Sequence, residues 1–195
     1  MNEAERQEKL RQQTDEQYLA IGKFVVKFEH ICRELRDGIM WMLYEKGLAD
    51  QRIADLMVEG LTAAPLTDRF VSLVAHTQQL SPGAEVIVKE ILARVRDLIP
   101  KRNEVIHGTW FIGWGSTTQT DFSTASLEKI CKKKNVARRK RLDMRVEDLE
   151  LLTEEAEALE QLVFRLWVCL TSGHDVEKNF ARSTDGEIVP FVVEV

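Results

Sequence analysis

Three polar residues carry the spacing in this chain that best suits chemistry: Arg102, Asn103 and His107, followed directly by Gly108. In a regular helix Asn103 and His107 share a face, whereas Arg102 and His107 are separated by about 140° around the axis. Arginine binds phosphate oxygens with a planar fork of donors, and histidine exchanges protons near neutral pH. The pattern therefore indicates chemistry on a phosphate group, with Arg102 as anion binder and His107 as general acid or base.

A second feature is a run of positive charge from Lys129 to Arg145. Nine of the 27 basic residues fall within this run against one acidic residue, Asp143, although the whole chain has a net charge of -5. Such a run can bind a phosphate backbone without base specificity. The residues expected to contact RNA are Lys132, Lys133, Lys134, Arg138, Arg139, Lys140 and Arg141.

Both the aromatic residues and the basic run also have a purely structural interpretation. Trp110, Phe111, Trp114 and Phe122 precede the basic run, and such rings can stack on unpaired bases. They can equally cover an apolar core. The basic run can be a solvated face, or it can pair with the acidic start of the last predicted helix.

The elements that position the motif are predicted to be helical before it and extended after it. Ser81-Pro82 begins a helix, and Pro100 is expected to kink or break it, leaving a short helical piece from Lys101 to His107. Gly108 ends that piece. The segment 109–114 is β-branched and aromatic, which predicts a strand.

The region after this strand is predicted to contain both extended and helical segments. A hairpin is expected to continue through residues 121–123, followed by a short helix from Ser126 to Lys134. The last long helix runs from Val146 to Leu170, because its apolar residues recur at helical spacing.

The N-terminal part is predicted to form a long amphipathic helix. Thr14 to Gln17 matches a capping box, and apolar residues keep helical spacing from there to Gly47. The predicted fold class is all-α, an up-down bundle of about five helices with a small extended or hairpin insertion after the motif helix. Residues 1–173 are predicted to form one helical domain that includes the basic insertion at about 109–145, and residues 174–195 a C-terminal tail.

The stretch Arg102-Asn103-Glu104-Val105-Ile106-His107 resembles the R-x4-H signature of the HEPN superfamily. The order of the predicted elements is also similar to the HEPN layout, in which an up-down bundle holds the motif near its third or fourth helix. The segment 22–35 is similar to the first helix of several HEPN families. Many members are dimeric, metal-independent ribonucleases of toxin and phage-defence systems.

The resemblance implies a reaction, a set of roles and a set of partners. RNA is cleaved by attack of the ribose 2′-hydroxyl on the adjacent phosphate, which leaves a 2′,3′-cyclic phosphate and a 5′-hydroxyl. His107 transfers protons, Arg102 binds the phosphate and Asn103 orients the imidazole or a phosphate. No metal or cofactor is implied. The partners are RNA, a second copy that completes the site, and a cognate antitoxin or regulatory protein.

Composition favours a cytoplasmic protein. Cys32, Cys131 and Cys169 are far apart and form no CxxC pair, which is typical of reduced thiols. The segment 1–17 is polar and has no apolar core, so it is not a secretory signal. No apolar run reaches the roughly 20 residues that a membrane span needs.

Two other functions remain open on the sequence. One is a non-catalytic HEPN-like module that binds RNA or a partner protein through the basic insertion and the first helix. In that case Arg102 and His107 are five apart by chance, and the histidine caps helix carbonyls before Gly108. The other is a metalloenzyme, which the absence of clustered Cys, His, Asp or Glu at ligand spacing disfavours.

Overall fold

Helices make up 70% of the computed structural model, and small antiparallel sheets accompany them. The structure describes residues 2–114, 121–133 and 136–191, and of residues 131–133 and 136–138 it describes the backbone. The prediction of a mainly helical protein is confirmed. The protein is not purely all-α, because the insertion after the motif helix contains paired strands and a second strand pair lies near the C-terminus.

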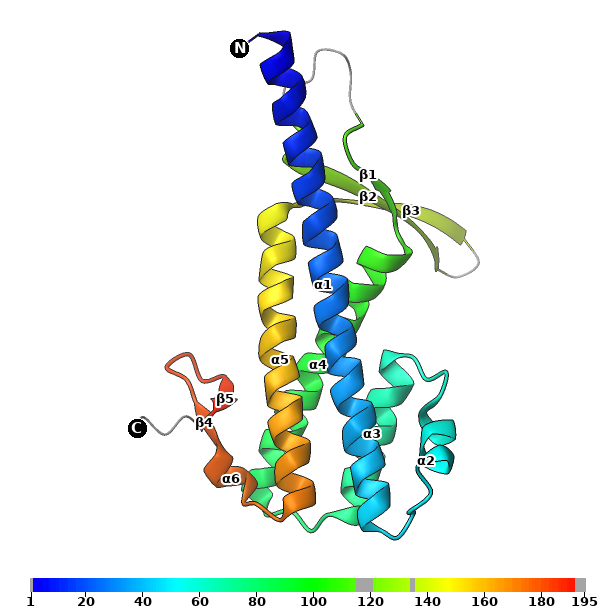
Figure 1. Ribbon diagram of the computed structural model, residues 1–195, viewed down its shortest axis with the longest axis vertical. Helices are drawn as coiled ribbons and strands as arrows, with labels where there is room; N and C mark the ends of the chain where they lie inside the picture. The colour runs from blue at the N-terminus through cyan, green and yellow to red at the C-terminus, as the bar shows by residue number, and fades with distance from the viewer. Residues whose placement is uncertain (1, 115–120, 134–135, 192–195) are drawn as a thin grey trace. The chain divides into compact units, whose positions relative to one another are not determined.

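Six helices lie within the described residues (Figure 1). They are α1 (Glu3–Glu45), α2 (Gln51–Val58), α3 (Ala63–Thr77), α4 (Pro82–His107), α5 (Val146–Ser172) and α6 (Val176–Asn179). The predicted start of α4 at Ser81-Pro82 and the predicted extent of α5 are confirmed to within a few residues.

The chain groups into two compact units, which are described separately below. The first unit comprises Met1–Lys27 and Pro100–Glu155, and the second comprises Phe28–Ile99 and Ala156–Val195. Helices α1, α4 and α5 contribute residues to both units. The motif, the basic run and the aromatic residues that precede it all belong to the first unit.

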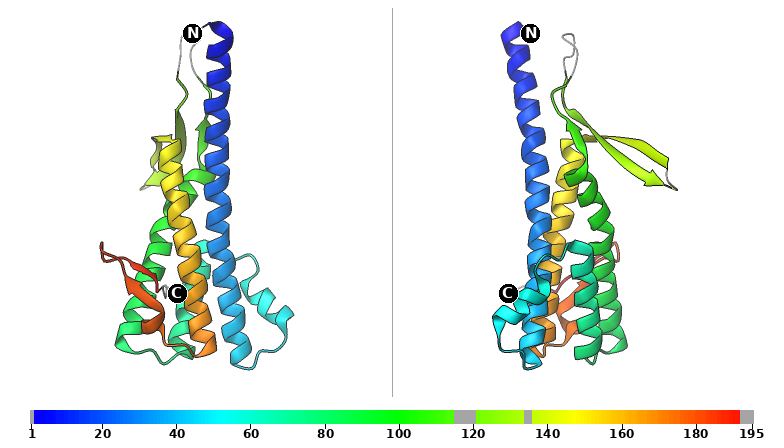
Figure 2. Two further views of the ribbon diagram at one scale, coloured as in Figure 1. Left: turned by 60° about the vertical axis from the view of Figure 1, so that its left-hand side comes forward. Right: turned by 90° about the vertical axis from the view of Figure 1, so that its right-hand side faces the viewer.

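In the first unit, three strands form an antiparallel sheet in the order β1 (Thr109–Phe111), β2 (Thr124–Lys133) and β3 (Val136–Arg145). Strands β2 and β3 form a long ribbon (Figure 2), and β1 pairs with residues 126–128 of β2. The predicted strand after the motif is confirmed, although it ends at Phe111.

The predicted helix from Ser126 to Lys134 is wrong, because this segment is β2. Ala125 and Leu127 are buried, while their neighbours Ser126 and Glu128 are only half-buried. This alternation has the period of two that a strand needs when one face covers a core. Pairing with β3 over the whole length of β2 satisfies the backbone groups of β2 on that edge.

Helix α1 starts well before the predicted capping box. The backbone N–H of Glu5 donates to Asn2 Oδ1 at 2.9 Å, and the backbone N–H of Asn2 donates to Glu5 Oε2 at 2.8 Å. This reciprocal pair is the capping box that begins the helix. Thr14 is an interior residue whose hydroxyl donates to the Leu10 carbonyl at 2.8 Å, so the predicted start at Thr14 is wrong.

Helix α4 continues through Pro100 to His107, so of the kink or break predicted at the proline the break is wrong, and residues 101–107 are not a separate helical piece. Proline removes one backbone hydrogen bond from a helix. Apolar residues on either side of it are buried, Leu98 and Ile99 before it and Val105 after it. Burial of this apolar face stabilises helical conformation on both sides of the proline.

The core of the second unit is built around the later part of α1, which lies beside α3 and α5 (Figure 1). Phe28, Ile31, Leu35, Ile39 and Met42 of α1 are fully buried. Gly38 lies where these helices approach most closely. A Cβ atom on Gly38 would be 2.7 Å from Phe70 Cε2 of α3 and 2.8 Å from Trp167 Cβ of α5.

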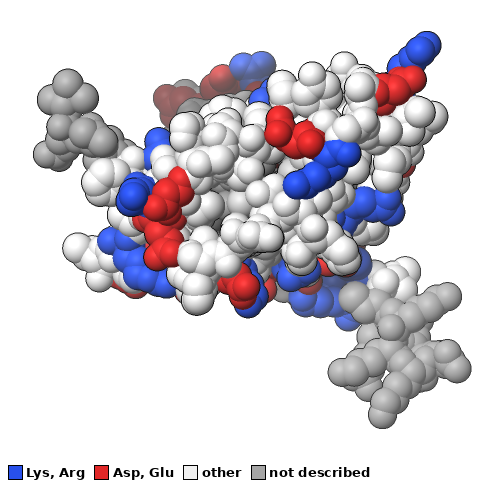
Figure 3. All heavy atoms as spheres, turned by 90° about the horizontal axis from the view of Figure 1, so that it is seen from below, with Lys and Arg blue, Asp and Glu red and all other residues white. Residues whose placement is uncertain are grey.

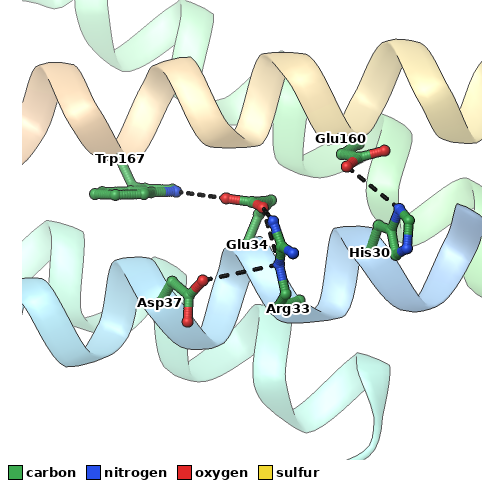
Figure 4. A network of polar contacts seen from close by, with 6 residues as sticks. All are labelled: His30, Arg33, Glu34, Asp37, Glu160 and Trp167. Atoms are coloured by element: carbon green, nitrogen blue, oxygen red, sulfur yellow. Dashed lines mark hydrogen bonds and ion pairs between the residues drawn. The ribbon is translucent and has the colours of Figure 1, made fainter.

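A polar network joins α1 and α5 within this unit (Figure 4). The carboxylate of Glu34, whose residue is 2% exposed, accepts hydrogen bonds from Trp167 Nε1 at 3.1 Å and from Arg33 Nη2 at 2.6 Å. Burial, and then the neighbouring Glu34 carboxylate, raise the pKa of Asp37. The buried carboxylate of Glu34 is therefore satisfied by donors from both helices. Nearby, His30 Nδ1 of α1 lies 3.3 Å from Glu160 Oε1 of α5.

The C-terminal part is more regular than the predicted tail. After α6, strands β4 (Phe180–Arg182) and β5 (Ile188–Pro190) form an antiparallel pair. Arg165 of α5 donates to the Phe191 carbonyl at 2.6 Å and so ties this segment to the second unit.

On the face in Figure 3, acidic and basic side chains are interspersed among uncharged ones, and neither sign covers the face. None of the described helices combines the length and the hydropathy needed to cross a bilayer.

Two glycines of α1 should respond to alanine in opposite directions. Gly38→Ala places a methyl group against Phe70 and Trp167, so we expect the free energy of unfolding to fall by about 1–3 kcal/mol. Gly22 has no atom within 4 Å of its would-be Cβ. Gly22→Ala should raise the free energy of unfolding by about 0.5–1 kcal/mol, because alanine favours helix. Urea unfolding of both variants measures the two changes in the free energy of unfolding. Changes of the same sign and size would contradict the close packing at Gly38.

Candidate functional site

The motif occupies the last two turns of α4. Arg102 and Asn103 are half-buried, and Arg102 Nη1 donates a hydrogen bond to Asn103 Oδ1 at 3.2 Å. The amide oxygen accepts from the guanidinium, so this contact orients the arginine side chain. Two of the three predicted site residues are therefore in direct contact.

His107, the third predicted site residue, is exposed at the end of α4. Its imidazole makes no hydrogen bond or ion pair with any residue that the structure describes. In particular, no such contact joins it to Arg102 or Asn103. This agrees with the angular separation expected for residues five apart on a helix. One copy of the chain thus presents the imidazole and the guanidinium on different sides of the same helix end.

The end of α4 is held by contacts with its own last turn and with the sheet. The N–H of Gly108 donates to the Glu104 carbonyl at 3.0 Å, and Trp110 Nε1 donates to the Val105 carbonyl at 2.8 Å. A Cβ atom on Gly108 would overlap Leu127 Cδ1 and would be 2.7 Å from Leu127 Cγ. The position therefore needs glycine because of close packing against β2.

The basic run is only partly placed beside the motif. Lys140 Nζ lies 2.6 Å from Glu104 Oε1, which joins β3 to the last turns of α4. Arg139, Lys140 and Arg141 are exposed. The side chains of Lys132, Lys133 and Arg138 are not described, and Lys134 lies outside the described residues.

Strand register divides the basic run between the two faces of the ribbon. Lys129 pairs with Lys140, on the same face as Leu127. Arg139 and Arg141 alternate with Lys140 along β3 and belong to the opposite face. Among the predicted RNA-binding residues whose side chains are described, Lys140 therefore lies on the face opposite to Arg139 and Arg141. The sequence contains the necessary signal, an alternation of period two, which the prediction of a helix there overlooked.

The face that carries Arg141 also carries an open groove that the sequence analysis did not predict. Its volume is about 500 Å³, and its walls include Phe111, Trp114, Ser126, Glu128 and Asp143. The rings of Phe111 and Trp114 meet edge to face, with centroids 5.2 Å apart. Trp114 is 75% exposed. The groove thus combines an accessible aromatic ring with charged groups of both signs.

The four aromatic residues singled out in the sequence have different environments. Trp110 is half-buried and its indole N–H bonds the helix end, so its role is structural. Phe122 is half-buried, and its backbone N–H donates to Gln13 Oε1 at 2.9 Å. Phe111 and Trp114 line the groove. The structural interpretation thus holds for Trp110, whereas base stacking on Phe111 or Trp114 stays a prediction.

The described cysteines and potential metal ligands do not form a reactive or metal-binding group. Cys32 and Cys169 are buried and form no disulfide with each other, and burial raises the pKa of Cys169. Within residues 2–114, 121–133 and 136–191, no three His, Cys, Asp or Glu side chains lie close enough together to hold a metal ion.

Comparison of the chain with protein-family models, with curated proteins and with solved structures finds no match. Its function is therefore argued from the residues of the motif and their surroundings.

The contact between Gly108 and Leu127 predicts coupled effects of substitution. Gly108→Ala should lower the free energy of unfolding by about 1–3 kcal/mol, since the new methyl group overlaps Leu127. Leu127→Ala should cost about 2–5 kcal/mol through the cavity that it leaves. The double variant should be less destabilised than the sum, because the smaller side chain accommodates the methyl group. Denaturant unfolding of the three variants measures the coupling, and strict additivity would contradict the contact.

Proposed function

We propose that this protein is a HEPN-type, metal-independent endoribonuclease that acts as a homodimer. The observation that carries the proposal is the end of α4, where His107 is exposed and Arg102 is oriented by Asn103. An accessible imidazole and an oriented guanidinium are the groups that phosphodiester cleavage needs when the substrate supplies its own nucleophile.

In the proposed reaction, the ribose 2′-oxygen attacks the adjacent phosphorus and the bond to the 5′-oxygen breaks. One imidazole accepts the proton of the 2′-hydroxyl, and a second imidazole in its protonated form donates a proton to the leaving 5′-oxygen. Arg102 binds the non-bridging oxygens, where negative charge builds up in the transition state. Asn103 holds the guanidinium through its amide oxygen. The products are a 2′,3′-cyclic phosphate and a 5′-hydroxyl.

A second copy of the chain completes this site. One copy contributes its imidazole and its guanidinium from different sides of a helix end, and the reaction uses two imidazoles. Pairing the ends of two α4 helices around a two-fold axis supplies both groups from both copies. The proposed fold is accordingly the up-down bundle of the HEPN superfamily, with β1 to β3 as an insertion after the motif helix.

The basic ribbon is proposed to guide RNA to the motif. The ion pair between Lys140 and Glu104 keeps β3 beside the last turns of α4. Exposed Arg139 adds positive charge on the opposite face of the same strand. Contacts between Arg139 and the phosphate backbone supply affinity rather than sequence preference.

A ribonuclease of this kind fits a toxin or phage-defence role in the cytoplasm, where its activity has to be restrained. A cognate antitoxin or regulatory protein is the partner that we propose for this purpose. Such a protein would act by covering the motif or by separating the two copies.

The test is cleavage of single-stranded RNA in the presence of a chelator. His107→Ala and Arg102→Ala should each lower the rate by about 10²-fold or more, because each removes a group that acts only in the transition state. Matched substitutions of exposed residues outside the motif, His174→Ala and Arg52→Ala, should leave the rate unchanged. Circular dichroism of all four variants should match that of the original protein. Chelator-resistant cleavage that survives both motif substitutions would reject the proposal.

The second candidate function is a non-catalytic module that binds RNA through the ribbon. The exposed basic residues of β3 favour it, because they need no dimer to contact a phosphate backbone. In that case Lys132, Lys133, Arg138 and Arg139 replaced together by Glu should abolish RNA binding, while Arg102 and His107 remain dispensable.

A matched control reverses the charge of four exposed basic residues elsewhere, Lys9, Lys23, Lys46 and Arg52. Filter binding at two salt concentrations measures both sets. Binding that is insensitive to salt, or equally weakened by the control set, would contradict a specific role for the ribbon.

A further inference from the structure

The groove on the sheet carries charged groups that its own residues leave unsatisfied. Arg141 Nη2 donates to the Ser126 hydroxyl at 2.6 Å, and Arg141 Nε lies 3.4 Å from Asp143 Oδ1. The Ser126 hydroxyl, and then the Arg141 guanidinium, hold the pKa of Asp143 below its ordinary value. These contacts fix the guanidinium, while its Nη1 makes no hydrogen bond with any described residue.

Glu128 is the cross-strand neighbour of Arg141, and both line the groove. Arg141 is turned toward Ser126 and Asp143, so no ion pair forms between Glu128 and Arg141. Among the residues that the structure describes, none hydrogen-bonds the Glu128 carboxylate. The groove therefore holds a pair of free acceptor oxygens next to a free pair of guanidinium donors.

Aromatic side chains form the apolar part of the same groove. Phe111 braces Trp114 edge to face, which leaves a face of the indole accessible. A flat aromatic ligand such as a nucleobase can stack on such a face. The ligand that fits is thus planar, has donors for a carboxylate and has an acceptor for a guanidinium.

We propose that this groove binds an unpaired guanine base of single-stranded RNA. Guanine presents two adjacent donors, N1–H and the N2 amino group, which match the two oxygens of Glu128. Its O6 and N7 accept hydrogen bonds and are the usual partners of arginine, here Arg141 Nη1. The base stacks on Trp114.

The other bases match the groove less well. Adenine and cytosine offer one amino group beside a ring nitrogen that accepts, and that acceptor faces the carboxylate unfavourably. Uracil offers one N–H between two carbonyl oxygens, which are repelled by Glu128. A carboxylate that selects paired donors therefore distinguishes guanine from all three.

A phosphate contact next to the base is available on the same face. Arg139 lies two residues along β3 from Arg141, about 7 Å away on the same side of the strand. Arg139 is exposed and can bind the phosphate that follows the stacked base.

This inference rests on the proposed function, because it names the base beside which the RNA would be held for cleavage. Its test uses a labelled oligonucleotide of thymidines with one central deoxyguanosine, which lacks 2′-hydroxyls and cannot be cleaved by the proposed reaction. Fluorescence anisotropy should give about tenfold tighter binding than for an all-thymidine oligonucleotide. Deoxyinosine in place of deoxyguanosine removes the N2 amino group and should lose most of that preference.

Substitutions in the groove should separate base selection by Glu128 from base stacking on Trp114. Glu128→Gln should abolish the preference for guanine, whereas Glu150→Gln, a control at an exposed position of α5, should preserve it. Trp114→Ala should weaken binding of both oligonucleotides. Equal affinity for the two oligonucleotides, no measurable binding of either, or a preference that persists in Glu128→Gln would overturn the inference.

The outcomes also separate this inference from the proposed function. RNA cleavage without a guanine preference rejects the groove and leaves the endoribonuclease standing. A guanine preference without chelator-resistant cleavage rejects the endoribonuclease and leaves a base-binding groove.

Discussion

The packing of Leu127 against Gly108 is the constraint on which the first unit depends. Glycine at the end of α4 allows β2 to approach the helix end more closely than any side chain would permit. That approach sets the register in which Thr109, Trp110 and Phe111 of β1 meet β2. The helix end that carries His107 is therefore positioned by the sheet as well as by its own hydrogen bonds.

Once this register is set, the alternation of side chains along the strands assigns each residue to a face. Leu127 and Lys140 share the face from which Lys140 reaches Glu104 of α4. Glu128 and Arg141 belong to the opposite face and line the groove. A shift of one residue would exchange the two sets. The proposed catalytic motif and the proposed base site are thus consequences of a single register.

The spacing of apolar residues made most of the long helices predictable, whereas single local motifs were right at some positions and wrong at others. The spacing of apolar residues predicted α5 and most of α1, and Ser81-Pro82 predicted the start of α4. The capping-box pattern at Thr14 predicted the wrong start for α1, because a capping box formed by Asn2 and Glu5 begins the helix earlier. Strand β2 was missed because its charged residues obscured the alternation of Ala125 and Leu127. The groove depends on cross-strand pairing, which one sequence does not reveal.

In the proposed reaction the substrate's own 2′-hydroxyl is the nucleophile, and the protein supplies only proton transfer and an anion-binding group. Mass spectrometry of the ends of RNA cut by the purified protein distinguishes this reaction from attack by water. We expect 2′,3′-cyclic phosphate and 5′-hydroxyl ends. Ends that carry a 3′-hydroxyl and a 5′-phosphate, or RNA that stays intact, would contradict the proposed reaction.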